Sequence, residues 1–303
     1  MLKSSFQPII TDAEVWCLPE GASEFQRTNS LSSEAPGETT KLIERVSEEG
    51  RPGILHQEND FPDTAYDRFG RRAAIGIPVI VSGKVNSILT LFVQCSSEAT
   101  GAIEVWERDR QRDELGLRGA VFSKLGRFAN VSHYIKFPRG SGLPGRCWED
   151  RQVKLVDRLG SSPDFMRAAG ARAGGLDLGV ALPVMGSEHE LHSVIQFLSS
   201  SRSPIARVFE IWDITDDTSE IQLRTCSHVQ CDSFEATTRD LEYRSGEGIV
   251  GKTWETGQAM VCSDLPSVDP KRASAASADG ITSAIAMPVF VGEFLKSVFL
   301  MFN

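Results

Sequence analysis

The sequence predicts an α+β fold built from three tandem modules, and the main observation behind this prediction is internal repetition. A glycine turn followed by a tryptophan, residues 140–148, recurs at residues 246–254, an offset of 106. A strand-like run shares the offset, because residues 104–106 (EVW) match residues 210–212 (EIW). Within one copy, strand patterns at both ends enclose short helices, whereas a parallel sheet would need longer helices between its strands.

A shorter copy opens the chain. Residues 14–16 (EVW) supply its first strand, and Pro78 lies in a strand-like run that recurs around Pro183 and Pro288. The distance from the strand tryptophan to the strand proline is 62 residues in the first copy and 77 and 76 in the other two. Segments of about 100 residues are a common size for one domain. The predicted modules are residues 1–98, 99–203 and 204–303.

The second copy shows the order of elements most clearly. Apolar and polar patterning predicts strands at residues 102–107 and around 120–122, a short helix at 143–149, a short strand at 153–156, and a terminal hairpin of residues 180–185 and 193–198. Pro183 lies inside a strand pattern, so we expect an edge or a bulge there. The segments that join the copies are short, which predicts closely coupled modules.

A further helix is expected before the hairpin. Residues 162–164 (SPD) combine an N-cap residue, a proline at the first helical position and an acidic first turn. The residues Phe165, Met166, Ala169 and Ala173 form the expected apolar stripe, and residues 174–175 (GG) end the helix. Equivalent signals are Asp269, Pro270 and Gly280 in the third copy and Asp60, Pro62 and Gly70 in the first.

Composition indicates a globular protein and argues against several partners. The 303 residues are 41% hydrophobic and 24% charged, and the net charge of -9 disfavours a nucleic-acid backbone as a partner. No apolar run is long enough to span a bilayer, and the N-terminus lacks a secretion signal. We therefore expect a cytoplasmic protein with no membrane partner. The six cysteines form no C-x-x-C pair, so reduced thiols are expected.

Two motifs are interpreted as structural. Residues 246–253 (GEGIVGKT) match the phosphate-binding loop pattern, but Arg146 and Cys147 replace its lysine and threonine in the upstream copy. The glycines therefore belong to the repeat rather than to a nucleotide site. On a strand, Cys226 and His228 would share a face while Cys231 points away, which leaves too few ligands for zinc. No metal site is predicted.

These motifs resemble the GAF family, the small sensor domains of phytochromes, cyclic-nucleotide phosphodiesterases and bacterial signalling proteins. The family pattern is a G-x-G-[LIV]-x-G turn with a short tryptophan-bearing helix, then a helix and a strand ending in Pro-Val. It fits residues 140–184 and 246–289. The first copy keeps the Pro78 strand and a helix around Leu42 that ends near Gly50, but it lacks the glycine turn. The resemblance implies antiparallel sheets of five or six strands, with a degenerate first module.

The resemblance also implies a pocket between the sheet and the helices of each complete module. Aromatic and cationic residues near the turn and helix are the candidate ligand contacts: Tyr134, Phe137, Arg139, Trp148, Phe165 and Arg172 in the second copy, and Tyr243, Arg244 and Trp254 in the third. The alternative interpretation is that the tryptophans and Phe165 are core residues. No residue identifies a particular ligand or cofactor.

We therefore expect a non-catalytic small-molecule sensor or signalling scaffold that acts on a signalling partner in trans, because no output segment follows the third copy. Family members pair, so a homodimer is also allowed, although the short links leave no room for the usual flanking helices. The alternative is a thiol-dependent enzyme of the free methionine sulfoxide reductase type that uses Cys147 or Cys262. A third interpretation is a purely structural protein with filled cores.

Overall fold

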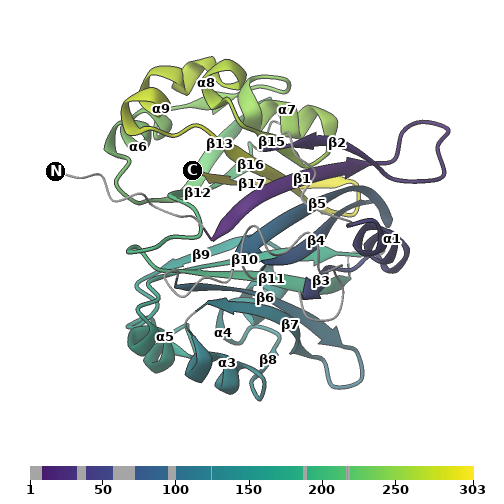
Figure 1. Cartoon of the computed structure of the whole chain (residues 1–303), viewed down its shortest axis with the longest axis vertical. Coiled ribbons are helices and arrows are strands. Elements are labelled where there is room, and N and C mark those ends of the chain that lie inside the picture. Colours follow the sequence, from purple (N-terminus) through teal and green to yellow (C-terminus); the bar gives the residue numbers. More distant parts are fainter. Residues whose placement is uncertain are drawn as a thin grey trace.

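The computed structural model describes residues 9–32, 39–56, 72–94, 100–123, 125–186, 190–215, 217 and 219–303. The strands of these residues form three sheets, and every strand pairing among them is antiparallel (Figure 1). The first sheet has five strands and the other two have six each. The predicted α+β class with three antiparallel sheets is confirmed.

The three sheets repeat one strand order. The first runs β2 (Gln26–Ser30), β1 (Ile10–Cys17), β5 (Lys84–Gln94), β4 (Arg72–Val81) and β3 (Gly53–His56). The second runs β8 (Lys136–Pro138), β7 (Glu114–Ser123), β6 (Gly101–Asp109), β11 (Leu191–Ser199), β10 (Leu178–Met185) and β9 (Lys154–Asp157). The third runs β14 (Glu242–Tyr243), β13 (Ile221–His228), β12 (Val208–Ile214), β17 (Phe294–Phe302), β16 (Ala284–Val291) and β15 (Met260–Cys262). We call each sheet, with the helices in its chain segment, the first, second or third module.

The helices are short. They are α1 (Thr40–Glu49) in the first module; α3 (Gly126–Ser132), α4 (Gly142–Asp150) and α5 (Ala168–Gly174) in the second; and α6 (Asp232–Thr238), α7 (Gly248–Thr256), α8 (Leu265–Val268), the 3₁₀ turn η3 (Pro270–Arg272) and α9 (Ala273–Asp279) in the third. The helices α1, α4 and α7 occupy equivalent positions. Each ends at a residue in the left-handed conformation, Gly50, Arg151 or Gly257. The predicted end of the first helix near Gly50 is confirmed.

The repeated glycine turn is explained by close packing. A Cβ atom on Gly145 would lie 2.3 Å from the carbonyl oxygen of Pro138, and one on Gly251 would lie 2.0 Å from that of Arg244. Real Cβ atoms do not approach an oxygen so closely, so only glycine lets α4 and α7 pack on the preceding strand segments. The phosphate-loop match in the third module therefore follows from helix packing within an antiparallel module.

The predicted helix start at residues 162–164 was wrong. Residues 161–167 form turns, and α5 begins only at Ala168. Of the predicted apolar stripe, Phe165 is buried, whereas Met166, Ala169 and Ala173 are exposed. The turns direct Phe165 and Arg167 inward, which a regular helix over these residues would not do. In the third module, η3 precedes α9, and the helix ends at Gly280 as predicted. The equivalent residues of the first module, 60–70, lie outside the described residues.

Pro183 lies in β10, which is an internal strand of the second sheet. Its neighbour β9 pairs with β10 only as far as Ala181, so the strand has a free side at the proline. A bulge follows between Val184 and Met185. Both features remove the need for the N–H that proline lacks.

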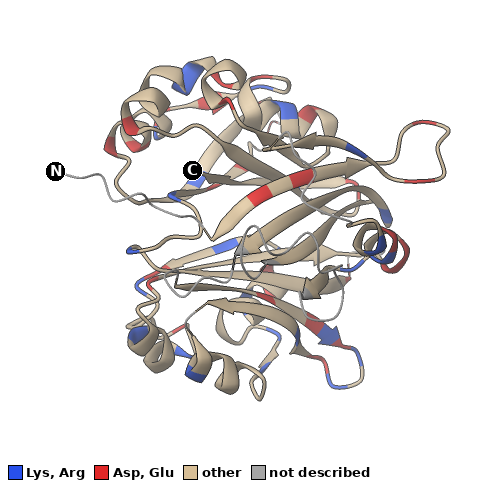
Figure 2. Cartoon of the chain, viewed as in Figure 1, with Lys and Arg blue, Asp and Glu red and all other residues tan. Residues whose placement is uncertain are grey.

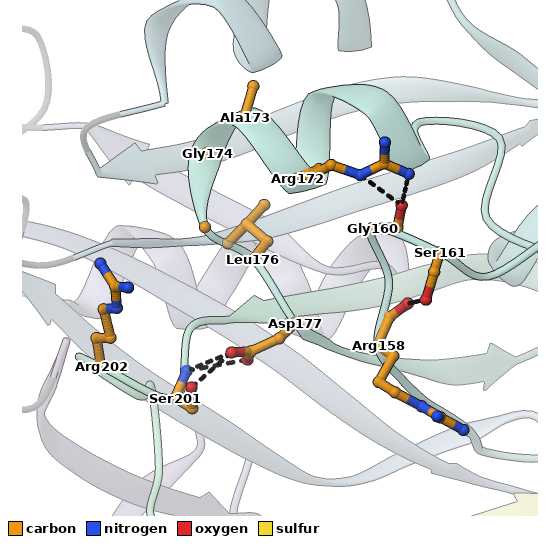
Figure 3. Close-up of a pocket in the computed structure, with 11 residues that line it drawn as sticks. Arg158, Gly160, Ser161, Arg172, Ala173, Gly174, Leu176, Asp177, Ser201 and Arg202 are labelled. Carbon is orange, nitrogen blue, oxygen red and sulfur yellow. Dashed lines mark hydrogen bonds between the residues drawn. The ribbon is translucent and has the colours of Figure 1, made fainter.

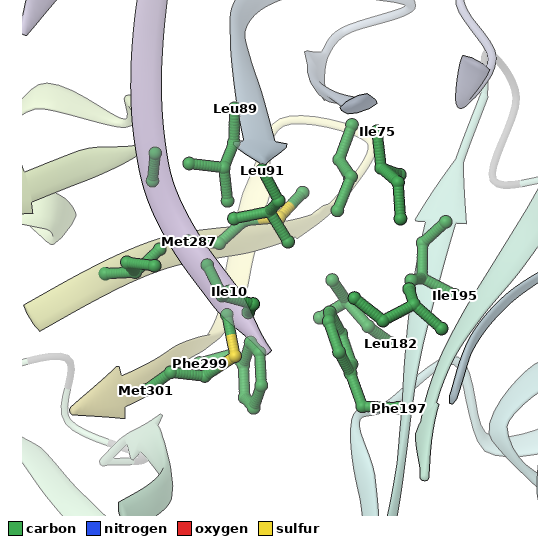
Figure 4. Packing of buried hydrophobic residues seen from close by; sticks show 14 of the residues in the cluster. Ile10, Ile75, Leu89, Leu91, Leu182, Ile195, Phe197, Met287, Phe299 and Met301 are labelled. Atoms are coloured by element: carbon green, nitrogen blue, oxygen red, sulfur yellow. The ribbon is translucent and has the colours of Figure 1, made fainter. Parts of the chain in front are cut away.

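The largest hydrophobic cluster is shared by all three modules (Figure 4). It contains Leu91 of the first sheet, Leu182 and Phe197 of the second, and Met287 and Phe299 of the third. The equivalent strands β4, β10 and β16 contact one another at its centre. All eight residues of β10 are buried because one face meets its own helices and the other meets the neighbouring sheets. This common core is additional to the smaller hydrophobic clusters of the individual modules.

The contacts between modules repeat around the common core. The edge strand β9 of the second module contacts β13 of the third, and β15 of the third contacts β2 of the first. On the remaining side, Ile54 of β3 packs on Gly119 of β7. Each edge strand therefore contacts the second strand of another module, and the three contacts close a ring with pseudo-threefold symmetry.

Hydrogen bonds between modules also recur. Asn86 Nδ2 donates to the carbonyl oxygen of Gly257 at 2.8 Å, and the equivalent His192 places Nδ1 3.2 Å from the carbonyl oxygen of Gly50. Both acceptors are the left-handed residues that end equivalent helices. Arg224 of β13 donates to the carbonyl oxygen of Val153 at 2.8 Å. The contact between a strand side chain and the carbonyl oxygen at a helix end thus recurs at two module boundaries, which supports the ring arrangement.

Many charged residues lie on the helices, turns and strand ends, and two acidic stretches lie within β1 (Figure 2). This distribution agrees with the apolar common core. Among the described residues, no helix has the length and apolar character needed to cross a membrane.

Candidate functional site

A buried ion pair lies between the sheet and the helices of the second module, a space that we call its chamber. Arg167 donates from Nη1 to Glu104 Oε1 at 2.5 Å and from Nη2 to Glu104 Oε2 at 2.8 Å. The two side chains are 1% and 0% exposed. Trp106, on the same face of β6, donates its indole N–H to the same carboxylate at 3.1 Å. Charges at this depth persist only when they are paired and hydrogen-bonded.

Aromatic rings enclose the guanidinium group of Arg167. It lies 4.5 Å from the ring centre of Phe128 and 5.3 Å from those of Trp106 and Phe165. Arg167 also donates to Gln196 Oε1 at 3.0 Å. Cation–π contacts and hydrogen bonds to the two Nη atoms replace part of the hydration that the arginine loses on burial, whereas its Nε has no partner among the described residues. In the described residues, this chamber is filled by the side chains of the module itself.

The third module has an equivalent ion pair. Arg272 donates from Nη1 to Glu210 Oε2 at 2.8 Å, and both side chains are 0% exposed. Trp212 Nε1 donates to Glu210 Oε2 at 2.8 Å. Burial alone would raise the pKa of Glu210, but Arg272, Trp212 and His228 outweigh it and hold the pKa below its ordinary value. Glu210 therefore remains a carboxylate inside the chamber.

The two chambers differ at two positions, which in the third module are occupied by the hydrogen-bonded pair Tyr243 and Asp269. Tyr243 donates its hydroxyl to the buried carboxylate of Asp269 at 2.9 Å. The equivalent residue in the second module is Phe137, which has no hydroxyl, and the equivalent Asp164 is half-exposed and pairs with Arg146. Burial raises the pKa of Tyr243 well above its ordinary range. The tyrosine is therefore a fixed hydrogen-bond donor.

The first module keeps part of this arrangement. Glu14 of β1 is buried and accepts hydrogen bonds from Trp16 Nε1 at 3.2 Å and Arg27 Nη1 at 2.8 Å. The arginine comes from the neighbouring strand β2 and is about one-third exposed. Burial raises the pKa of Glu14, and Arg27 offsets this only in part. The glutamate and tryptophan two residues apart are thus common to all three modules.

The structure divides the predicted ligand contacts into two groups. Phe137, Trp148, Phe165 and Tyr243 are buried, and Trp254 is partly buried against the core of the third module. Tyr134, Arg139, Arg172 and Arg244 are exposed. The buried aromatic residues Phe137, Phe165 and Tyr243 border the chamber arginines, which the exposed residues do not reach. The structure therefore does not bring the predicted contacts together around one space.

The prediction missed the two chamber arginines. The signal was present in the sequence, because Arg167 and Arg272 each follow an aspartate by three residues, Asp164 and Asp269, at an offset of 105. Arginine is rarely buried, so an arginine in a repeat is normally assigned to the surface. The repeated glutamate of the EVW and EIW runs is the partner that permits burial.

A hollow of about 710 Å³ opens on the surface of the second module (Figure 3). Arg158 reaches it from the loop after β9, Arg172 from α5, and Arg202 from the link to the third module. Arg172 donates to the carbonyl oxygen of Gly160 at 3.1 Å through Nε. Asp177 accepts hydrogen bonds from Ser201 N at 2.9 Å and Oγ at 2.6 Å.

Two arginines of this hollow lack a direct hydrogen-bond partner. Among the described residues, the guanidinium groups of Arg158 and Arg202 make no hydrogen bond or ion pair. The lining contains one carboxylate, Asp177, whose oxygens accept bonds from Ser201, and the neighbouring Asp157 interacts electrostatically with Arg158. The volume lies within the range of small-molecule sites. A hollow of this size with excess positive charge is suited to an anion.

The thiols named for an enzymatic function are buried. Burial raises the pKa of Cys147 far above its ordinary value, and it raises the pKa of Cys262 to about 11. A thiol that holds its proton is a poor nucleophile. The described residues contain no group of three or more histidine, cysteine or acidic side chains that could hold a metal ion.

No protein-family model and no curated protein matches the chain. Solved structures do match it, each over about one third of the chain. One is the GAF domain/HD domain protein from Geobacter sulfurreducens, with 16% identity, a TM-score of 0.29, and coverage of 35% of this chain and 67% of that chain. Another is a GAF sensor protein from Burkholderia vietnamiensis, with 14% identity, a TM-score of 0.26, and coverage of 34% and 56%.

A third match is the free methionine-R-sulfoxide reductase from Neisseria meningitidis, with 17% identity and a TM-score of 0.26. It covers 32% of this chain, and the matched part spans about half (51%) of the reductase chain. The antiparallel strand order and the glycine turns of the second and third modules are those that the sequence resemblance to the GAF family predicts.

Proposed function

We propose that the chain is a non-catalytic sensor of GAF-like modules that binds a small anionic molecule in the arginine hollow and acts on a signalling partner in trans. The observation that carries this proposal is the set of three arginines around one hollow, and the guanidinium groups of two of them, Arg158 and Arg202, make no hydrogen bond or ion pair among the described residues. Guanidinium groups are suited to bidentate binding of carboxylate or phosphate oxygens. Arg172 was among the residues predicted from the sequence.

The position of the hollow supports a sensing role. Ser201 and Arg202 belong to the link between the second and third modules. Three residues after Arg202 the link enters the common core, where Ile205 is 0% exposed. An anion held by Arg202 and Arg172 would tie this link to α5. Ligand binding would thereby bias the contact between two modules, which is how a binding event acts at a distance.

A calorimetric titration of the full chain with inorganic phosphate and with malonate tests the proposal. We expect at least one probe to bind with a dissociation constant below about 1 mM. Two matched variants replace arginines with the residues that stand at the equivalent positions of the third module, Arg158→Asp and Arg172→Ser. Each should weaken binding at least tenfold, whereas Arg112→Ser, in the turn between β6 and β7, should leave binding unchanged. Equal binding by all four proteins would contradict the proposal.

A second candidate is a scaffold that binds no small molecule. It is favoured by the filled chambers of the second and third modules, where Arg167 and Arg272 occupy the space in which the predicted pocket would lie. Absence of binding by either probe would support the scaffold. The enzymatic alternative has less support, because the buried Cys147 and Cys262 hold their protons.

A further inference from the structure

Three apolar side chains are exposed on the side of the second module that carries its helices. Val131 of α3, Tyr134 just after it and Met166 just before α5 are 54%, 87% and 57% exposed. They are three of the five large apolar side chains that are exposed among the described residues. On α3, Phe128 and Ser132 are buried, so Val131 and Tyr134, which lie three residues apart, share the solvent side.

The segments that carry these side chains are held together. Arg167, next to Met166, donates from Nη1 to Ser132 Oγ of α3 at 2.6 Å, and α3 also contacts α5. The backbone N–H of Tyr134 donates to the carbonyl oxygen of Val131 at 3.1 Å. The three apolar side chains therefore belong to one surface, which we call the second-module patch. Apolar groups gathered on a surface mark interaction sites, whereas single exposed ones need no explanation.

Basic side chains flank the second-module patch. Arg127 lies one helical turn before Val131 on α3, and Lys136 lies two residues after Tyr134 on β8. Together with Arg139, they are exposed and make no hydrogen bond or ion pair in the part of the chain that the structure describes. The patch therefore combines apolar surface with positive charges that are free to meet a partner.

The third module lacks such a patch. At the positions equivalent to the three apolar side chains it has Thr237, Asp240 and Lys271. The first two follow from the offset of 106, and the third follows from the offset of 105 that relates the two chamber arginines. All three replacements are polar, so the fold of a module does not require apolar residues at these positions. The patch is a separate property of the second module.

The charge of the helix-bearing segment reverses between the two modules. Residues 125–177 contain nine lysines and arginines and five acidic residues, whereas the equivalent residues 231–282 contain five and nine. Without the buried Arg167, Arg272 and Asp269, the counts are eight and five against four and eight. The helices of the second and third modules lie at opposite ends of the molecule (Figure 1). Each molecule therefore has a basic face at one end and an acidic face at the other.

The reversal is clear at individual exposed positions. Strand pairing aligns Lys136 of β8 with Glu242 of β14, because each lies next to the aromatic residue that borders its chamber. Glu242 is exposed, as is Asp240, which stands where the second module has Tyr134. We call the helix-bearing side of the third module, with these two carboxylates, the acidic face.

We propose that the second-module patch is an interaction surface for a second copy of this chain and docks on the acidic face of that copy. Charge selects this occupant, because the net charge of -9 opposes contact between copies in most orientations, whereas the basic surroundings of the patch attract the acidic face. Burial of the three apolar side chains at the contact supplies affinity. The two docking faces differ, so the contact is heterologous and continues from copy to copy.

Sedimentation equilibrium of the full chain tests the proposal. We expect the average mass to rise above the 33.2 kDa of one chain as protein concentration increases. It should fall back toward that value when salt is raised from about 0.05 M to about 0.5 M, because salt screens the attraction between the two faces.

Matched variants separate the two faces. Tyr134→Asp takes the residue of the third module and should weaken self-association by about tenfold or more. Asp240→Lys combined with Glu242→Lys reverses two exposed charges of the acidic face and should weaken it to a similar extent. Phe294→Lys is the control, because Phe294 is 62% exposed but belongs to neither face, and Lys84 stands at its position in the first module. The control should associate like the parent.

A mixture of the two face variants gives the sharpest result. Each variant keeps the face that the other lacks, so neither should self-associate at concentrations where the mixture forms a complex of one copy of each. The complex should grow no further, because its two outer faces are the altered ones. Formation of this complex also shows that both variants are folded.

Three results would overturn the proposal. A parent chain that stays monomeric at every protein and salt concentration would show that a second copy is not the occupant. Self-association of Tyr134→Asp equal to that of the parent would place the contact elsewhere. Full self-association of the variant with the altered acidic face would mean that patch meets patch. None of the three arginines of the hollow is changed in these variants, so the titration with phosphate and malonate remains a separate test.

Discussion

Arg167 and Glu104 form a bidentate ion pair that is almost completely buried, with side chains 1% and 0% exposed. Arg272 and Glu210 repeat this pair in the third module. The pairs hold the turn before α5 and the 3₁₀ turn before α9 against the first strand of each sheet. They also occupy the chambers in which the sequence resemblance placed a ligand pocket.

Removing one member of such a pair leaves an uncompensated buried charge. We expect Arg167→Met to lower the free energy of unfolding by about 3 to 5 kcal/mol. The double variant Glu104→Leu with Arg167→Met removes both charges and should recover much of this loss. Urea denaturation of the full chain measures both effects. A single variant within about 1 kcal/mol of the parent would contradict the pairing.

Tyr243 supplies a hydrogen bond that the second module lacks. Tyr243→Phe leaves the buried Asp269 without this donor, so we expect a loss of about 1 to 3 kcal/mol in unfolding free energy. Tyr134→Phe is the control, because Tyr134 is 87% exposed and should change stability by less than about 0.5 kcal/mol. Equal effects of the two variants in urea denaturation would argue against the buried hydrogen bond.

A substitution at Gly145 tests whether close packing of α4 explains the repeated glycine turn. An alanine there would bring Cβ to 2.3 Å from the carbonyl oxygen of Pro138, so α4 would have to move away from the strand. We expect a loss of at least about 3 kcal/mol, although alanine normally favours a helix over glycine by about 1 kcal/mol. Gly126→Ala, in α3, meets no atom within 4 Å and should be neutral or stabilising. Thermal unfolding of both variants makes the comparison; a stable Gly145→Ala protein would refute the packing account.

The raised pKa of His228 predicts that the free energy of unfolding depends on pH. Its pKa is about 9 in the folded protein against an ordinary value of 6.5. Between these values the folded chain holds more protons than the unfolded chain. The contribution of His228 to the free energy of unfolding is therefore fully present below pH 6.5 and is lost as pH rises through 9. We expect His228→Phe to remove about 2 kcal/mol of this decline, after allowance for solvent screening. Denaturation at pH 6 and pH 9 gives the difference; parallel profiles for parent and variant would oppose the assignment.

The sequence was sufficient to predict the local structure that repeats in the modules. The spacing of Pro78, Pro183 and Pro288 located equivalent strands, and the helix ending near Gly50 was placed correctly. Local signals failed at residues 162–164, where a good helix start was overridden by the need to turn Arg167 inward. Propensity is a local preference, and burial of a paired charge outweighs it.

The common core could not be predicted, because an apolar strand does not specify what covers its second face. The full burial of β10 is equally compatible with helices, a second sheet or another chain. The arginine hollow was also beyond prediction, since Arg158 and Arg202 are far apart in sequence and meet only through the link between modules. Of its arginines, only Arg172 was among the candidate residues.

Native-state hydrogen exchange of β4, β10 and β16 at increasing denaturant tests most directly whether three GAF-like modules share one core. If they do, the buried amides of these strands open together, and their exchange free energies converge on one value as denaturant increases. Three separate values that persist to the unfolding transition would show that the modules open independently and would contradict the closed ring.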